Sequence, residues 1–233
     1  VAYNIPGLQG ALKLPRDVFA AIFLGEITRW NDERIVAANP ALNLPESRIQ
    51  VIARRDSSGT TYAFTNHLSA ISEQWRNGPG VAKLIDWPGS AMVALGNEGV
   101  AQRLKISRNS IGYVEYGFAR RLGLPMAKLQ NRSGQYVSPG PAGGKSALSA
   151  GVNNIPDNLR LFLPDPAGEN AYPIVSLVWL LVHGSYEDPA KEAALFEAIE
   201  WGLSEGQDVA EEMGYIPLPG NLIDLTRKAI HAR

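Results

Sequence analysis

The chain has 233 residues, of which 45% are apolar and 19% are charged, so it can bury one large core or two modest ones. Its formal net charge is −1, which excludes a strongly basic surface for nucleic acid or an anionic membrane. Because it contains no cysteine, neither a disulfide framework nor a thiol nucleophile is possible. No apolar run approaches the roughly 20 residues that a membrane helix needs.

Short strands alternate with helices in the first part of the chain. Pro6-Gly7 ends the first strand, Pro15 suits a helix start and Gly25 suits its end. Strands are expected at 1–5, 49–53 and 110–114, and helices at 15–25, from 30 onward, after 60 and at 97–104. This alternation predicts an α/β fold with a mainly parallel sheet.

The composition changes between residues 130 and 165. The stretch Pro139–Ser146 ends in Gly-Lys-Ser like a nucleotide-binding P-loop, but Pro139 stands where that motif needs a glycine. A flexible surface loop is therefore expected there. The apolar run Ile174–Val182 then predicts a buried strand. A helix opening at Pro189 and a last one that begins over 207–213 complete the chain.

No metal or cofactor site is predicted. His67, His183 and His231 are scattered singly, without the spacing of zinc ligands, and His67 is expected to be a surface or packing residue. The five tryptophans fall at separate positions in apolar contexts, which is typical of core or lobe-edge packing and not of a stacking platform.

The stretch Arg54–Thr61 (RRDSSGTT) is the strongest candidate site. A strand that turns through Ser, Gly and Thr into a helix presents free N–H groups at a positive dipole end, where anions dock. Arg54 adds a fork of donors that suits a tetrahedral oxyanion. Asp56 can only accept, so it favours an anion that still carries a proton, such as hydrogen phosphate, over sulfate. On residue types alone, simple capping of the helix by Ser57, Ser58 and Thr60, with Asp56 in solvent, is an equal alternative.

This stretch resembles the ligand loop of the periplasmic phosphate-binding proteins of ABC phosphate transporters, the PstS family. Seven further segments resemble family signatures in family order: Val1–Gly7, Phe23–Asp32, Thr60–Leu68, Gly96–Val100, Ser110–Tyr116, Leu129–Asn131 and Glu211–Pro219.

The resemblance implies a type II periplasmic-binding-protein fold with two α/β lobes and mainly parallel sheets. Residues 1–165 would form a complete lobe that carries the ligand loop, and residues 166–233 the returning C-terminal part of the other, incomplete lobe. It implies phosphate binding by Arg54, Asp56, Ser58, Gly59 and Thr60. Arg54 would pair with the phosphate, Asp56 would accept its proton, and the other three would donate hydrogen bonds.

The implied function is binding of inorganic phosphate in a cleft between the lobes and its delivery to an ABC phosphate permease. No enzymatic activity, cofactor or nucleic-acid partner is expected. The expected location is periplasmic or extracytoplasmic, and a membrane anchor on a full precursor stays open.

The main departure from the family concerns its N-terminal part. The family begins with a strand and a Gly/Thr-rich loop that contacts the ligand, and nothing in this chain matches that region. Three alternatives stay open: a fragment, a missing N-terminal segment on another chain, or a variant that lacks the region. We expect the chain alone to bind phosphate weakly or not at all.

Two other functions are alternatives. A phosphatase-like enzyme would use Ser58 or Thr60 as nucleophile, but no histidine lies close in sequence and no carboxylate cluster suits two metals. A sensory or adhesive domain would reuse the fold without transport.

Overall fold

The computed structural model describes residues 1–152, 155–156 and 158–231. The strands are β1 (Ala2–Asn4), β2 (Lys13–Leu14), β3 (Gln50–Arg54), β4 (Met92–Ala94), β5 (Ser110–Gly112), β6 (Lys128–Gln130) and β7 (Tyr136–Val137). The helices are α1 (Arg16–Leu24), α2 (Glu33–Ala38), α3 (Gly59–Ile71), α4 (Glu73–Asn77), α5 (Gly96–Ile106), α6 (Tyr116–Arg121), α7 (Pro141–Gly151), α8 (Pro189–Leu203), α9 (Gly206–Ala210) and α10 (Gly220–His231).

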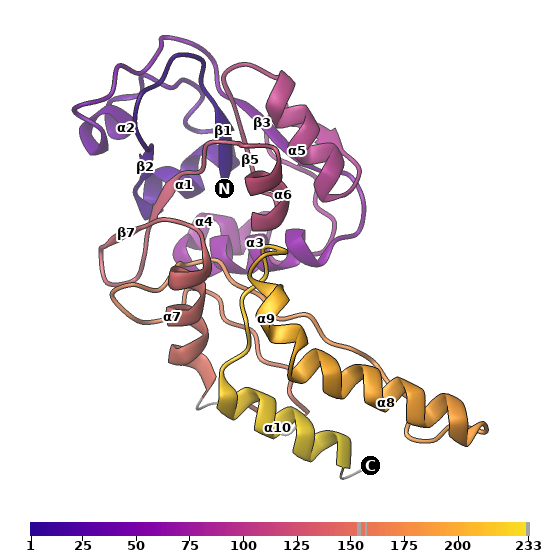
Figure 1. Cartoon of the computed structure of the whole chain (residues 1–233). Coiled ribbons are helices and arrows are strands. Elements are labelled where there is room, and N and C mark those ends of the chain that lie inside the picture. The colour runs from indigo at the N-terminus through magenta and orange to yellow at the C-terminus, as the bar shows by residue number, and fades with distance from the viewer. Residues whose placement is uncertain (153–154, 157, 232–233) are drawn as a thin grey trace.

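The strands form two small sheets in the upper part of the molecule (Figure 1). The four-stranded sheet has the order β1-β5-β3-β4, in which β3 runs parallel to both β4 and β5, and β1 is antiparallel to β5. The three-stranded sheet has the order β2-β6-β7. Because β3, β4 and β5 are parallel, their carboxyl ends lie at one edge of the sheet, where open α/β sheets bind ligands.

Helix α1 begins and ends as the sequence predicts. Pro15 precedes its first turn, and Gly25 takes a left-handed conformation (φ 78°) that closes the last turn, with its N–H donating to the carbonyls of Ala21 and Ile22. The helix is apolar almost all round and its residues 18–23 are buried, so it lies inside the upper core.

The aromatic core of the upper part supports the strand ends. Phe64 of α3 packs edge-to-face on Phe23 of α1, with ring centroids 4.8 Å apart. Its ring also stacks on Tyr113, at 4.3 Å. Burying a side chain such as Phe64 contributes about 1.5–3 kcal/mol, so this packing fixes the start of α3 and the Tyr113 ring relative to each other.

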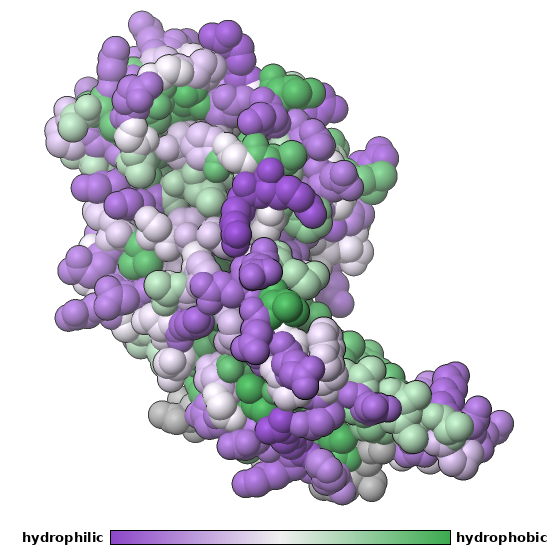
Figure 2. Space-filling view, viewed as in Figure 1, coloured by the Kyte–Doolittle hydropathy of each residue, from purple (hydrophilic) through white to green (hydrophobic). Residues whose placement is uncertain are grey.

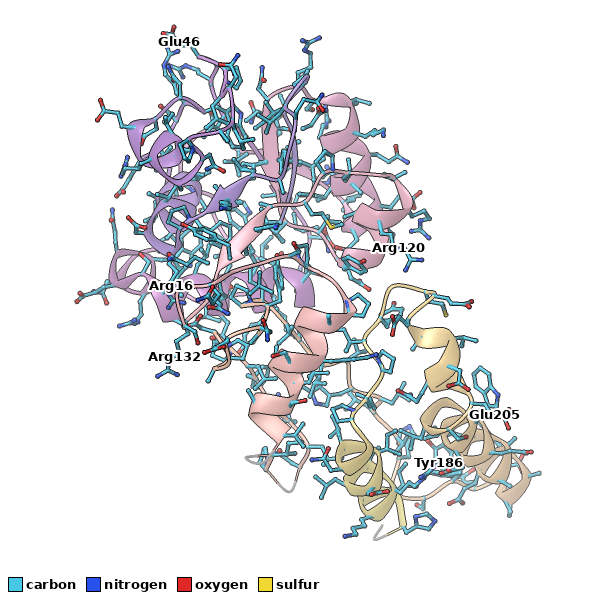
Figure 3. The ribbon with its side chains drawn as sticks, turned by 60° about the vertical axis from the view of Figure 1, so that its left-hand side comes forward. Arg16, Glu46, Arg120, Arg132, Tyr186 and Glu205 are labelled. Atoms are coloured by element: carbon cyan, nitrogen blue, oxygen red, sulfur yellow. The ribbon has the colours of Figure 1, made fainter. Side chains whose placement is uncertain are left out.

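The helices α7, α8, α9 and α10 lie below the sheets in Figure 1. Helix α7 contacts the C-terminal residues, because Lys145 pairs with Glu211 at 3.0 Å and Gly144 leaves no room for a Cβ against Ile216. In Figure 3, Arg120 on α6 faces this part, and its Nη1 donates to the Glu211 carbonyl at 3.2 Å. The division of the chain at residue 165 stays a prediction. The contacts with Glu211 and Ile216 place α7 against residues that follow this position.

Three expectations about this part were wrong. The stretch predicted as a flexible loop forms helix α7, because Pro141 occupies its first turn and Gly140 (φ 149°) allows the chain to enter it. The helix expected to begin over 207–213 is present as α9 (Gly206–Ala210), but it is not the last one, because α10 follows it. The run Ile174–Val182 is neither a strand nor buried, since it has no neighbouring strand within the described chain.

Candidate functional site

Three loops meet at the carboxyl ends of β3, β4 and β5. The loop after β3 holds Asp56, and its Oδ1 accepts a hydrogen bond of 3.1 Å from the N–H of Gly96, which follows β4. Tyr113 follows β5, and its hydroxyl accepts from the N–H of Arg54 at 3.1 Å. The parallel strands therefore bring together residues that are up to 59 positions apart in sequence.

Arg54 and Asp56 form a two-pronged ion pair. Arg54 donates from Nε to Oδ1 at 2.8 Å and from Nη2 to Oδ2 at 2.5 Å. The pair holds the pKa of the Asp56 carboxyl well below its usual range, chiefly through the Arg54 hydrogen bonds and against the effect of desolvation; the Gly96 N–H adds to the lowering. A guanidinium has five N–H donors, so about three remain for another acceptor. Arg54 is thus held in place and still able to pair with an anion.

The start of helix α3 offers free backbone donors. Ser58 is extended (φ −142°, ψ 132°), and its Oγ accepts from the N–H of Thr61 at 3.2 Å, so Ser58 is the N-cap. The N–H of Gly59 and the N–H of Thr60 make no hydrogen bond to any other described residue. These two donors stand at the positive end of a 13-residue helix, where an anion is stabilised.

Ser58 also keeps a donor. Its side chain is buried, and its hydroxyl accepts in the cap, so the hydroxyl hydrogen can still be donated. The capping interpretation and the binding interpretation of Ser58 are therefore compatible.

Tyr113 connects this loop to the core. Its hydroxyl lies 2.7 Å from Oγ1 of Thr61, in addition to the bond from the Arg54 N–H. Burial raises the pKa of Tyr113 to about 12, so the hydroxyl stays neutral at physiological pH. Sequence reasoning gave neither residue a role, although the segment Ser110–Tyr116 stood among the family signatures. The signal was the place of Tyr113 inside a family-like segment, and only the fold shows what its side chain touches.

The surface hollows near the loop lie beside Arg55. One, of about 480 Å³, is lined by Arg54, Arg55, Trp87 and Val93 among others. Gly59 and Thr60 do not line this hollow; Gly59 is exposed and Thr60 is partly buried.

Other candidate chemistries find no support at this edge. His67 is buried in the core, with its ring centroid 6.1 Å from that of Phe19. Within the described ranges, no group of three metal-ligating side chains comes together. None of the described helices is both long and apolar enough to cross a bilayer.

The comparison with known families agrees with this geometry. The sequence model of a family described as "PBP superfamily domain" matches residues 1–205. The chain belongs to this superfamily. The fold predicted from the sequence is thereby confirmed: a PBP-type α/β architecture with open, mainly parallel sheets.

Named relatives share much of the chain. It is 38% identical over 221 residues to the phosphate-binding protein PstS of Haemophilus influenzae, covering 94% of this chain and 66% of the relative. It is 38% identical over 250 residues to PstS of Methanocaldococcus jannaschii, covering 99% and 64%. The chain thus spans a little less than two thirds of the length of these relatives.

Solved structures share the fold at lower identity. A high-affinity periplasmic phosphate-binding protein, PfluDING, matches with a TM-score of 0.72 at 20% identity, over 97% of this chain and 67% of that chain. A human phosphate-binding apolipoprotein matches with a TM-score of 0.70 at 20% identity, over 97% and 68%. At this identity the likeness supports the fold alone.

The predicted site residues come from one short loop, and the structure places them together at one sheet edge. They are Arg54, Asp56, Ser58, Gly59 and Thr60. Their role in binding stays a prediction. The fold adds Thr61, Gly96 and Tyr113 to this set. The N–H of Thr61 donates to Ser58, the N–H of Gly96 donates to Asp56, and the Tyr113 hydroxyl hydrogen-bonds with Thr61.

Proposed function

We propose that this chain binds inorganic phosphate at the start of α3. The observation that carries the proposal is the set of unused donors there: the N–H groups of Gly59 and Thr60, and the remaining N–H groups of Arg54. Relatives at 38% identity are named phosphate-binding proteins, which supports the same ligand. Each charge-assisted hydrogen bond contributes about 1.5–3 kcal/mol, so the donors of this one edge supply part of the roughly micromolar affinity of a closed site, and we expect this chain alone to bind phosphate weakly.

Arg54 would pair with the anion, and Ser58, Gly59 and Thr60 would donate hydrogen bonds to it. The contacts of Asp56 favour a role different from direct proton acceptance. Both of its oxygens accept from Arg54, and one also accepts from Gly96. Asp56 would therefore act as a positioning residue that holds the guanidinium at the strand end.

The rest of the function follows the relatives. A solved structure from Clostridium perfringens that shares the fold is described as a putative phosphate ABC transporter substrate-binding protein with bound phosphate (TM-score 0.53, 16% identity). We infer that this chain serves an ABC phosphate permease outside the cytoplasm and is not an enzyme. A closed site would need a second surface, supplied by a segment equivalent to the family's N-terminal part.

A substitution at Gly59 tests the backbone donors directly. Gly59→Pro deletes one N–H, and the helix start can accept it because Ser58 is already extended, as a residue before proline must be. Gly59→Ala is the matched control, since nothing lies within 4 Å of the added Cβ and the N–H remains. We expect phosphate affinity, measured by amide shifts in an NMR titration, to fall roughly tenfold or more for the proline variant. Equal affinity of both variants would remove the site from this helix start.

A further inference from the structure

Strand β4 is an open edge of the four-stranded sheet. Among the described residues it pairs with β3 alone, and it ends the order β1-β5-β3-β4. The carbonyl of Ala94 faces β3, because it accepts from the N–H of Arg55 at 3.1 Å. Backbone groups of successive residues in a strand point to opposite sides, so the N–H and C=O of Val93 face away from β3. Such groups can pair with another extended chain.

The side chains of β4 divide between the two faces of the sheet. Val93 is in register with Ala53, which belongs to the core on which Trp87 packs. Met92 and Ala94 flank Val93 in sequence and therefore point to the other face, where Ala94 packs on the cluster that contains residues of α5. One face of the edge thus looks towards the loop 84–89, and the other looks towards α5.

A hollow lies beside each face of this edge. The loop-side hollow is the one of about 480 Å³ that Trp87 lines. The α5-side hollow, of about 500 Å³, is lined by Leu95 and Ile106 among others. Val93 and Arg55 line both hollows. Because side chains alternate along a strand, a strand added at β4 would place them over the two hollows in turn.

Apolar side chains at this edge are exposed. Val93, Leu95 and Ile106, which line the same hollow, are 44%, 55% and 72% exposed. On the side of the upper part where α5 lies in Figure 1, Figure 2 shows hydrophobic residues at the surface among hydrophilic ones. Large apolar side chains exposed together and rimmed by polar residues are typical of an interaction surface.

The charges at the edge differ between the two hollows. Arg55 and Arg103 line the α5-side hollow, whose wall includes no acidic residue. Both are exposed, and within the described part of the chain neither has a hydrogen-bonding or ionic partner for its side chain. The loop-side hollow carries Asp86 as well as Arg55. Charge complementarity therefore favours an acidic side chain on the α5 side and an apolar one on the loop side.

We propose that β4 is a docking edge for an extended segment of a partner protein in which acidic and apolar residues alternate. The backbone of that segment pairs with Val93, and its apolar side chains enter the loop-side hollow beside Trp87. Its carboxylates meet Arg55 and Arg103 over the α5-side hollow. In this mode the main chain supplies affinity and the alternate side chains supply specificity. The inference does not depend on phosphate binding, because the free donors of α3 line neither hollow.

A peptide with this pattern tests the docking edge. The probe is a short peptide of alternating glutamate and valine with blocked ends, titrated into the ¹⁵N-labelled chain. We expect saturable shifts of the Val93 amide signal, with the Gly59 and Thr60 signals unmoved. The same peptide with every backbone nitrogen methylated keeps its side chains but cannot donate from its main chain, and it should leave Val93 unmoved.

Three results of this titration would overturn the proposal. The first is no shift of Val93 with either peptide. The second is an equal effect of the two peptides, which would show that no strand pairing takes place. The third is movement of the Gly59 and Thr60 signals alone, which would put the glutamates in the oxyanion site.

Reversal of one charge sharpens the test. Arg103→Glu should leave the chain folded, because the side chain is exposed, and should weaken binding of the glutamate peptide roughly tenfold or more. It should also bind a lysine–valine peptide more tightly than the unchanged chain does. Arg108→Glu is the matched control, since it reverses another exposed arginine that lines neither hollow, and it should keep the affinity.

Equal affinity of Arg103→Glu and the unchanged chain would contradict the docking edge, and so would an equal loss in the Arg108→Glu control. Movement of the Val93 signal in the chain alone as its concentration rises would assign the edge to a second copy and would likewise overturn the proposal.

Discussion

The hydroxyl of Tyr113 holds the candidate site onto the core, and Tyr113→Phe tests this directly. The change keeps the ring that stacks on Phe64 and removes two hydrogen bonds, one from the Arg54 N–H and one shared with Thr61. The Arg54 N–H is buried, so losing its partner costs about 1–3 kcal/mol, and the bond with Thr61 adds about 1 kcal/mol. We expect the free energy of unfolding to fall by about 2–4 kcal/mol in total.

Thermal unfolding measures this change. For a chain of this size, 2–4 kcal/mol corresponds to a fall in Tm of roughly 5–10 °C. Tyr136→Phe is the matched control, because the Tyr136 hydroxyl has no hydrogen bond to any described residue, and its Tm should change by less than 2 °C. A Tyr113→Phe variant as stable as the unchanged chain would refute the role given to this hydroxyl.

Three further changes test other parts of the account. Asp56→Asn should weaken phosphate and sulfate binding together in a competition titration, because it loosens Arg54; a selective gain in sulfate binding would show instead that Asp56 contacts the ligand. Arg16, labelled in Figure 3, donates two hydrogen bonds of 2.6 and 2.8 Å to the nearly buried Asp165. Arg16→Ala removes both and should lower the free energy of unfolding, measured in urea, by about 2 kcal/mol. Adding Asp165→Asn should restore part of this loss, because it removes the charge left unpaired. Burial lowers the pKa of His67 from 6.5 to about 4, with Asp165 opposing this shift and Arg16 adding to it. The free energy of unfolding should therefore be at its full value above pH 6.5 and fall by about 3 kcal/mol towards pH 4. His67→Leu should make the free energy of unfolding less dependent on pH in this range, and an unchanged pH dependence would contradict the assignment.

The local signals of the first half of the chain could be read from the sequence. Pro15 and Gly25 bound α1 because proline and glycine carry strong backbone preferences. Ser58 followed by Gly59 predicts the start of α3 because a capping hydroxyl needs only its own helix. These signals are short in range, so one sequence is enough to identify them.

Contacts between distant residues could not be predicted in this way. Nothing local relates Tyr113 to Arg54, or Gly96 to Asp56, because the parallel sheet creates these pairs. The apolar run Ile174–Val182 predicts a strand, yet a strand forms only where a neighbour pairs with it. Helix α7 was missed because Gly143 and Gly144 are unfavourable inside a helix, and close packing, such as that of Gly144 against Ile216, compensates for them.

The central claim is that an oxyanion binds at the start of α3, and an NMR titration of the ¹⁵N-labelled chain with phosphate tests it most directly. Such a titration detects even millimolar binding, so it does not require a closed site. We expect saturable shifts of the Gly59 and Thr60 amide signals and of the Arg54 side-chain signal. Phosphate that leaves all three signals unmoved, or that moves only signals elsewhere in the chain, would contradict the account.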